Sequence, residues 1–210
     1  MRLRKKPNRA MRLQRCAYLL IAEPEALRGR WLGEHRYEAL HVELGCGKGR
    51  FTAEIAKAKT EVFVVGIEKL PDALLTALER THEEGVQNLR FINALADNLA
   101  DYFAPGEVSC IYINFCDPWP ASKHEKRRLT SRSFLEMYMQ ILSPDGEIHF
   151  KTDNLSLFEF SLCEFELRGF KIMEVDRDLH KSAPTGIMTD YEQKFHEQGL
   201  PIYYVRVARS

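Results

Sequence analysis

The stretch HVELGCGKGR, residues 41–50, decides how the rest of the chain is interpreted. It joins an apolar strand to a G-x-G-x-G turn, and FTAEIAKAK at 51–59 continues as a helix. Glycines after a first strand permit a tight turn and let backbone amides approach a ligand closely. A dinucleotide-binding fingerprint would need a third glycine at position 50, where the chain has Arg50. We therefore expect a strand–turn–helix unit that binds a ligand at three glycines, Gly45, Gly47 and Gly49.

Strand-like and helix-like segments alternate along the whole chain. Apolar strands separated by helices of roughly 10–15 residues are typical of right-handed βαβ units. We predict an α/β fold with a doubly wound, mostly parallel seven-stranded sheet and helices on both faces. The segment 176–201 has no clear helix, which leaves room for an antiparallel last strand. The expected strands are 41–44, 61–68, 89–92, 108–115, 146–152, 170–175 and 202–208, and the expected helices are 51–59, 71–85, 131–142 and 155–168.

Length and composition narrow the class of protein. The chain has 210 residues, 45% of them hydrophobic, which is enough to bury a core, and we expect one domain over 1–210. No apolar run approaches the roughly 18 residues that span a bilayer, and the N-terminus does not resemble a signal peptide. Five cysteines without a CxxC pair argue against a disulfide framework and a metal site. We expect a cytoplasmic protein without a metal.

The charges are segregated, although 30 basic and 30 acidic side chains balance. A basic N-terminal arm, about 1–15, carries seven Lys or Arg and no acid, and we leave open whether it is partly helical. A second basic run, 121–132, has five cations against Glu125. Two such patches can attract a polyanion despite the neutral total. The alternative is that both are solvated charged faces.

Two acids accompany the glycine turn. Glu43 precedes it, and this arrangement resembles the S-adenosylmethionine loop of class I methyltransferases. Glu68 ends the second expected strand, where a carboxylate can accept hydrogen bonds from both hydroxyls of a ribose. Glu43 would hold the cationic methionyl end, directly or through water. The alternative for Glu68 is a surface acid that begins a helix.

The turn Asp117-Pro118-Trp119-Pro120 follows the fourth expected strand. Ligands of doubly wound sheets bind beyond the carboxyl ends of the strands at the switch point. We expect the first and fourth strands to flank that point, so that this turn faces the glycine turn. The prolines restrict the backbone around Trp119, whose ring either stacks on a base or packs under the turn. Asp117 is either functional or a helix cap.

These motifs together resemble one family. NFCDPWPASKHEKRRL at 114–129, E-x-G-x-G-x-G at 43–49, HFKTDN at 149–154 and TDYEQKF at 189–195 are similar to the bacterial tRNA (guanine-N7-)-methyltransferases. The resemblance covers essentially the whole chain. It implies S-adenosylmethionine as methyl donor and tRNA as substrate, with guanosine 46 of the variable loop as target.

The resemblance also implies roles for individual residues. Glu43, Glu68 and Asp117 match cofactor-contacting positions, and Asp117 matches the proposed catalytic aspartate. Other positions match substrate contacts. In the basic run these are Lys123, His124, Lys126, Arg127 and Arg128, and elsewhere they are Asp153, Thr189, Tyr191 and Glu192.

The chain departs from the family pattern at two positions. Ala121 stands where the family usually has a lysine that contacts the substrate, and Lys123 is the candidate replacement. Leu95 stands where the family often has an acid near the adenine. Asn93, Asp97 or backbone amides are the candidates to replace that acid.

The chemistry of guanine N7 shapes the expected site. N7 carries a lone pair, so the enzyme needs orientation and electrostatics rather than a strong base. Arginine usually reads guanine at O6 and N7, which would block the nucleophile. Recognition is therefore expected at the Watson–Crick edge, whose donors need carboxylates, and the candidates are Asp153, Glu192 and Asp117. The base would leave its stack to enter the pocket.

The sequence leaves three alternative functions open. An amino-group methyltransferase would carry a related turn after the fourth strand, without explaining the KHEKRR run. A small-molecule methyltransferase would share the glycine loop without needing the clustered cations. An RNA-binding module would not need Glu68 beside a nucleotide loop. The assembly state, monomer or homodimer, is also open.

Overall fold

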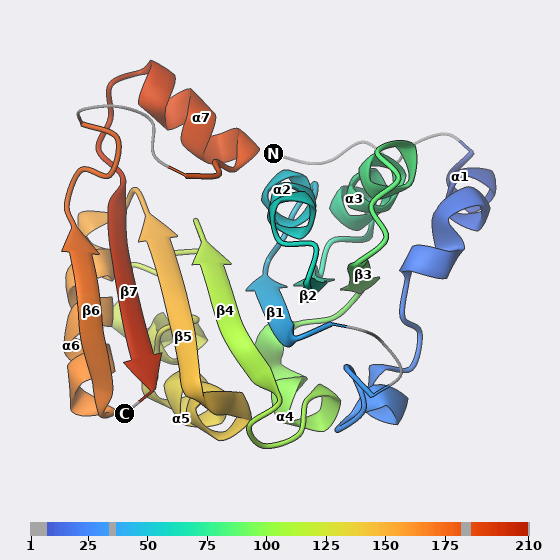
Figure 1. The fold of residues 1–210 in the computed structure, drawn as a ribbon. Helices are drawn as coiled ribbons and strands as arrows, with labels where there is room; N and C mark the ends of the chain where they lie inside the picture. The colour runs from blue at the N-terminus through green and yellow to red at the C-terminus, as the bar shows by residue number, and fades with distance from the viewer. Residues whose placement is uncertain (1–7, 34–36, 182–185, 210) are drawn as a thin grey trace.

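The computed structural model describes residues 8–33, 37–181 and 186–209. It contains a seven-stranded sheet in the order β3-β2-β1-β4-β5-β7-β6 (Figure 1). Neighbouring strands are parallel from β3 through β5, whereas β7 is antiparallel to both β5 and β6. The strands are β1 (Ala39–Leu44), β2 (Val62–Ile67), β3 (Leu89–Ile92), β4 (Val108–Asn114), β5 (Leu142–Thr152), β6 (Phe170–Asp176) and β7 (Tyr203–Arg209).

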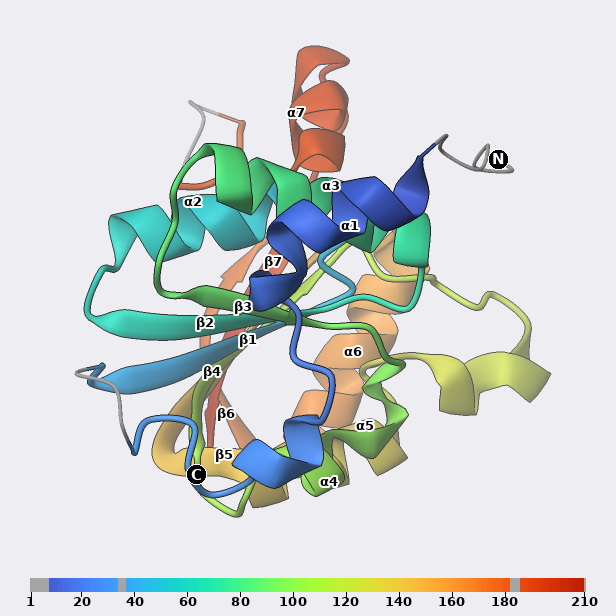
Figure 2. The same ribbon diagram turned by 90° about the vertical axis from the view of Figure 1, so that its right-hand side faces the viewer.

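Helices lie on both faces of this sheet. Figure 2 shows α1, α2 and α3 on one side and α4, α5 and α6 on the other. The helix α7 lies apart from these layers, beyond the carboxyl ends of the parallel strands (Figure 1). The helices are α1 (Arg9–Cys16), α2 (Arg50–Ala58), α3 (Pro71–Glu83), α4 (Leu99–Tyr102), α5 (Arg132–Ile141), α6 (Leu155–Leu167) and α7 (Asp190–Glu197).

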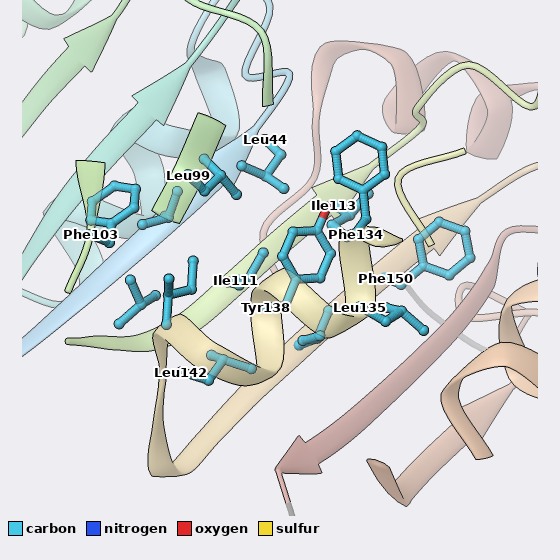
Figure 3. Packing of buried hydrophobic residues seen from close by; sticks show 14 of the residues in the cluster. Leu44, Leu99, Phe103, Ile111, Ile113, Phe134, Leu135, Tyr138, Leu142 and Phe150 are labelled. Carbon is cyan, nitrogen blue, oxygen red and sulfur yellow. The ribbon is translucent and has the colours of Figure 1, made fainter. Parts of the chain in front are cut away.

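Apolar residues of the central strands form a core on each face of the sheet. Ile111 and Ile113 of β4 pack toward α5, which contributes Leu135 and Tyr138 (Figure 3). On the opposite face, strand residues of β1–β4 pack under α2 and α3. The central strands are therefore buried on both faces. This explains why β2 is a continuous apolar run, whereas β1 alternates apolar residues with the buried polar side chains of His41 and Glu43. Two cores hold the carboxyl ends of β1 and β4 rigidly side by side.

The predicted fold class is confirmed, with one segment wrong. All seven strands and the four expected helices form within a few residues of their predicted bounds, and the last strand is antiparallel. The expectation that 176–201 lacks a helix is wrong, because α7 lies within it. Part of the basic arm is helical in α1, and residues 1–7 lie outside the described residues. No helix in the described parts of the chain is long and apolar enough to cross a bilayer.

Candidate active site

A cavity of about 340 Å³ lies at the switch point between β1 and β4. Its walls come from the glycine turn at 45–49, from the end of β4 and from α7. Phe51 and Asn114 also line a second hollow of about 630 Å³, which lies over β4, β5 and β7. The smaller cavity is therefore where a ligand would meet both the glycine turn and α7.

The three glycines of the turn have different tasks. All three have positive φ, 74° at Gly45, 56° at Gly47 and 73° at Gly49, a region that L side chains rarely adopt. A Cβ at Gly49 would lie 2.6 Å from the Cβ of Ala77 on α3, so this glycine permits helix packing. A Cβ at Gly45 would meet nothing within 4 Å, and one at Gly47 would meet only a backbone oxygen at 4.0 Å. Gly45 and Gly47 thus leave the loop open toward the cavity.

Glu68 is hydrogen-bonded to the glycine turn. Its Oε2 accepts a hydrogen bond from the Gly47 amide at 2.9 Å, and its Oε1 accepts one from the Leu70 amide at 2.7 Å. The side chain is buried at the end of β2. Each carboxylate oxygen has two lone pairs, so acceptor capacity remains for a ligand. Sequence reasoning missed this second role of Glu68, because the contact joins residues 21 positions apart.

Glu43 is buried at the end of β1 beneath the cavity. Its carboxylate accepts hydrogen bonds from the Thr52 hydroxyl and from the Asn114 amide, the latter at 3.0 Å. Burial raises the pKa of Glu43 to about 7, although these two donors act in the opposite direction. A cation placed beside Glu43 would favour the ionised form of this carboxyl group. The sequence analysis did not single out its two hydrogen-bond donors, Thr52 and Asn114.

Asp117 follows β4, but its side chain does not line the smaller cavity and is 65% exposed. Its Oδ2 is 3.3 Å from Nζ of Lys69, which follows β2. Two residues of this turn, Phe115 and Trp119, have positive φ values of 54° and 42°. Positive φ is uncommon for bulky residues and costs energy, so the surrounding contacts must hold this turn in shape.

Trp119 packs against the basic run rather than standing free. The Arg127 guanidinium lies 4.9 Å from the ring centroid, and the His124 ring meets it edge-on at 5.7 Å. Arg128 donates to the Trp119 carbonyl at 3.1 Å and lies over the Phe160 ring. Of the two readings of Trp119, the structure therefore favours packing within the turn.

The predicted RNA contacts form a short 3₁₀ helix, Ser122–Arg127. Lys123 and Lys126 are exposed, whereas His124, Arg127 and Arg128 also contact the Trp119 turn. In the other basic segment, Arg12 binds Glu79 of α3 through two contacts of 2.5 Å. The cations at positions 2–6 lie outside the described residues.

The helix α7 brings the C-terminal motif to the cavity. The Tyr191 hydroxyl donates to Asp153 at 3.4 Å, and its ring lies 5.0 Å from that of Phe115. Thr189 caps the helix and forms a capping box with Glu192. The T-x-x-E spacing of a capping box was visible in the sequence and would have located this helix.

Glu192 has a different place from the one we expected. We predicted a carboxylate that faces the guanine, but the side chain is fully buried. Its oxygens accept from Lys151 and His180 and from the Thr189 amide. The structure therefore contradicts the expected direct contact between Glu192 and the base, because the Glu192 side chain points into the protein.

The two departures from the family pattern lie at the surface. Ala121 is exposed, and Leu95 is 57% exposed just beyond β3. The Asn93 amide donates to the backbone carbonyl of Glu68 at 2.7 Å, so it ties the end of β3 to that of β2. Within the described residues, no group of three or more His, Cys, Asp or Glu side chains could hold a metal.

The strand order, the glycine turn after β1 and the buried acid after β2 define a class I methyltransferase fold. Solved structures agree on the fold: the chain matches the 16S rRNA methyltransferase KamB with a TM-score of 0.66 at 16% identity, over 89% of this chain and 92% of that one. A family model described as "Putative methyltransferase" matches residues 37–205.

Curated relatives narrow the class further. The chain is 46% identical to the tRNA (guanine-N(7)-)-methyltransferase of Geobacillus kaustophilus (strain HTA426), over 100% of this chain and 97% of the relative. It is 43% identical to the enzyme of the same name from Bacillus velezensis, over 99% and 96%. The chain therefore belongs to the tRNA (guanine-N(7)-)-methyltransferase family.

Proposed function

We propose that this protein transfers the methyl group of S-adenosylmethionine to N7 of a guanosine in tRNA, guanosine 46 of the variable loop by family resemblance. One observation carries the proposal. The open glycine turn and the Asp117 turn follow β1 and β4, the neighbouring strands at the switch point, in a chain that aligns from end to end with relatives of that name. We assign the activity to a single domain over 1–210.

The residues around the smaller cavity fit the methyl donor. S-adenosylmethionine supplies an electrophilic methyl group on a sulfonium sulfur when it is bound. Gly45 and Gly47 leave room for a ligand against the loop, where a Cβ would meet no close protein atom. Glu68 would accept from the ribose hydroxyls with its remaining lone pairs. Glu43 would face the cationic methionyl end of the cofactor. Gly49 lets the glycine turn pack closely against Ala77 of α3.

The guanine would enter between the Asp117 turn and α7. Asp153 and Asp117 are the acidic side chains there that could accept from the Watson–Crick edge. Carboxylates at this edge would also stabilise the positive charge that develops on the ring when N7 is alkylated. The Tyr191 ring, 44% exposed beside Phe115, offers an aromatic surface for the base. No residue has to act as a strong base.

The basic surface would hold tRNA phosphates. Lys123 and Lys126 are exposed and would make such contacts directly, whereas Arg127, Arg128 and His124 also hold the Trp119 turn. Phosphate contacts position an RNA without reading its sequence, which is left to the pocket. Since tRNA is a cytoplasmic substrate and all five cysteines are free thiols, we place the protein in the cytoplasm.

The proposal is tested by incubating the protein with unmodified tRNA and methyl-labelled S-adenosylmethionine and mapping the labelled nucleoside. The expected product is 7-methylguanosine at a single position of the variable loop. Label in an exocyclic amino group would instead identify an amino-group methyltransferase. Binding of tRNA without binding of cofactor would identify an RNA-binding module.

A further inference from the structure

A buried polar network lies beneath the first turn of α7. Glu192 is fully buried, and its Oε1 accepts from Nζ of Lys151 and from Nε2 of His180, each at 2.8 Å. Its Oε2 accepts from the Thr189 amide at 3.1 Å. Lys151 also donates to the carbonyl of Ile187 at 3.1 Å. Both oxygens of Glu192 are therefore engaged inside the protein.

The network ties α7 to the sheet and to the preceding segment. Lys151 lies on β5 in the core of the sheet, whereas His180 lies between β6 and α7. The His180 ring also packs edge-on against that of His196, at 5.3 Å, on the second turn of α7. A buried carboxylate that loses its partners is strongly destabilised, so α7 cannot shift without breaking this arrangement.

The same turn of α7 carries the side chains that reach the site. Tyr191 meets Asp153 and the Phe115 ring on one side. On the other side, the Asp190 carboxylate forms two ion pairs. Its Oδ1 lies 3.3 Å from Nη1 of Arg50, the residue directly after the glycine turn, and its Oδ2 lies 3.6 Å from Nη2 of Arg80. A displacement of this turn would therefore change both the pocket for the base and the wall of the cofactor cavity.

We propose that Lys151, Glu192 and His180 are positioning residues, which hold the first turn of α7 so that Tyr191 and Asp153 are placed for the guanine. Glu192 acts through α7 and does not touch the base. This inference rests on the proposed function for its link to methyl transfer. Its structural half, the immobilisation of α7, stands independently of the substrate.

The first test measures hydrogen exchange of α7 in the free protein, before any RNA is added. Glu192→Gln keeps the shape of the side chain but leaves the Lys151 ammonium without its carboxylate. Exchange of the α7 amides should become about 10- to 100-fold faster, the equivalent of one lost hydrogen bond to a charged group. Glu197→Gln is the matched control, since Glu197 is an exposed acid of the same helix. Exchange in β1 and β4 reports that each variant is folded.

The second test is a double-mutant cycle with Lys151→Met. Lys151→Met alone leaves a buried carboxylate unpaired, and Glu192→Gln alone leaves a buried ammonium unpaired, so both should lose turnover and α7 protection. The double variant removes both charges, and it should regain at least about tenfold in turnover and in protection over either single variant. A residue that touched the guanine could not be rescued in this way.

Two results would overturn the proposal. One is loss of turnover in Glu192→Gln with α7 exchange as slow as in the Glu197→Gln control. The other is a double variant no better than Glu192→Gln alone. If the wild-type protein methylates no tRNA, the proposed function fails, but the exchange measurements still decide whether the network holds α7.

Discussion

Replacing either of two glycines in the glycine turn by alanine adds one methyl group, but the two variants should lose different properties. Gly49→Ala should mainly lose stability, and Gly47→Ala should mainly lose cofactor affinity. Gly49→Ala places a Cβ 2.6 Å from the Cβ of Ala77 and 3.0 Å from its Cα, so α3 has to move. The left-handed φ of 73° costs about 1–2 kcal/mol for an L residue. Overpacking adds about 1–3 kcal/mol. The free energy of unfolding should therefore fall by about 2–5 kcal/mol.

Gly47→Ala should cost less stability but more affinity. Its φ of 56° carries the same left-handed penalty of about 1–2 kcal/mol. The nearest atom to the new Cβ would be the Gly45 carbonyl oxygen at 4.0 Å, so no overpacking is expected. The methyl group would instead occupy space that the cofactor needs. We expect S-adenosylmethionine to bind at least about tenfold more weakly, which is about 1.4 kcal/mol.

The assays are urea unfolding for stability and calorimetric titration for cofactor affinity. Gly106→Ala is the matched control: it has a φ of 75°, nothing within 4 Å of the new Cβ, and lies in a turn before β4, at the opposite end of the sheet from the glycine loop. The free energy of unfolding of Gly106→Ala should fall by the left-handed backbone cost alone, and its cofactor affinity should be unchanged. Equal cofactor affinity of Gly47→Ala and Gly106→Ala would refute the placement of the cofactor at this loop. Equal stability of Gly47→Ala and Gly49→Ala would refute the packing argument.

Three further predictions concern acids and cations of the site. Burial raises the pKa of Glu43 from its ordinary value of 4.5 to about 7 in the folded state. Between pH 4.5 and 7 the folded protein therefore keeps a proton on Glu43 that the unfolded chain has released. The contribution of Glu43 to the free energy of unfolding should therefore fall by about 3 kcal/mol as pH rises from 4.5 to 7. Glu43→Gln should remove this contribution, which is measured as the difference between the variant and the wild type in urea unfolding across that pH range. Lys123→Ala with Lys126→Ala should reduce the slope of log affinity for tRNA against log salt by about 1.4–1.8, with unfolding unchanged; an unaltered slope would make this run a solvated face. Asp117→Ala should change stability by less than about 0.5 kcal/mol because the side chain is exposed, yet lower turnover about 100-fold or more, and near-normal turnover would remove its catalytic role.

The strands and most helices could be predicted because their signals are local. Continuous apolar runs, glycine stops and the spacing of apolar residues depend on a few neighbouring positions. The helix α7 was missed because it has eight residues, too few for a periodic pattern to stand out. Its start at Thr189 and Glu192 was nevertheless encoded in a capping box.

Motif spacing indicated which segments lie around the switch point but did not show which way their side chains point. Glu192 belongs to the same short motif as Tyr191, but the two side chains have different surroundings. Tyr191 is 44% exposed beside the cavity, whereas Glu192 is fully buried against Lys151. Adjacent helical residues point about 100° apart, so a motif on a helix necessarily includes side chains that face inward.

The sequence by itself determined the class of fold, the glycine turn and the acids that end β1 and β2, since each rests on backbone preferences and burial that act over short distances. Tertiary structure alone decided the partners of those acids. Glu68 meets Gly47 across 21 residues, Asn114 meets Glu43 across 71, and Glu192 meets Lys151 across 41. Such pairs are brought together by the packing of whole strands and helices, and the energy that selects them, the avoidance of an unpaired buried charge, exists only once the core has closed.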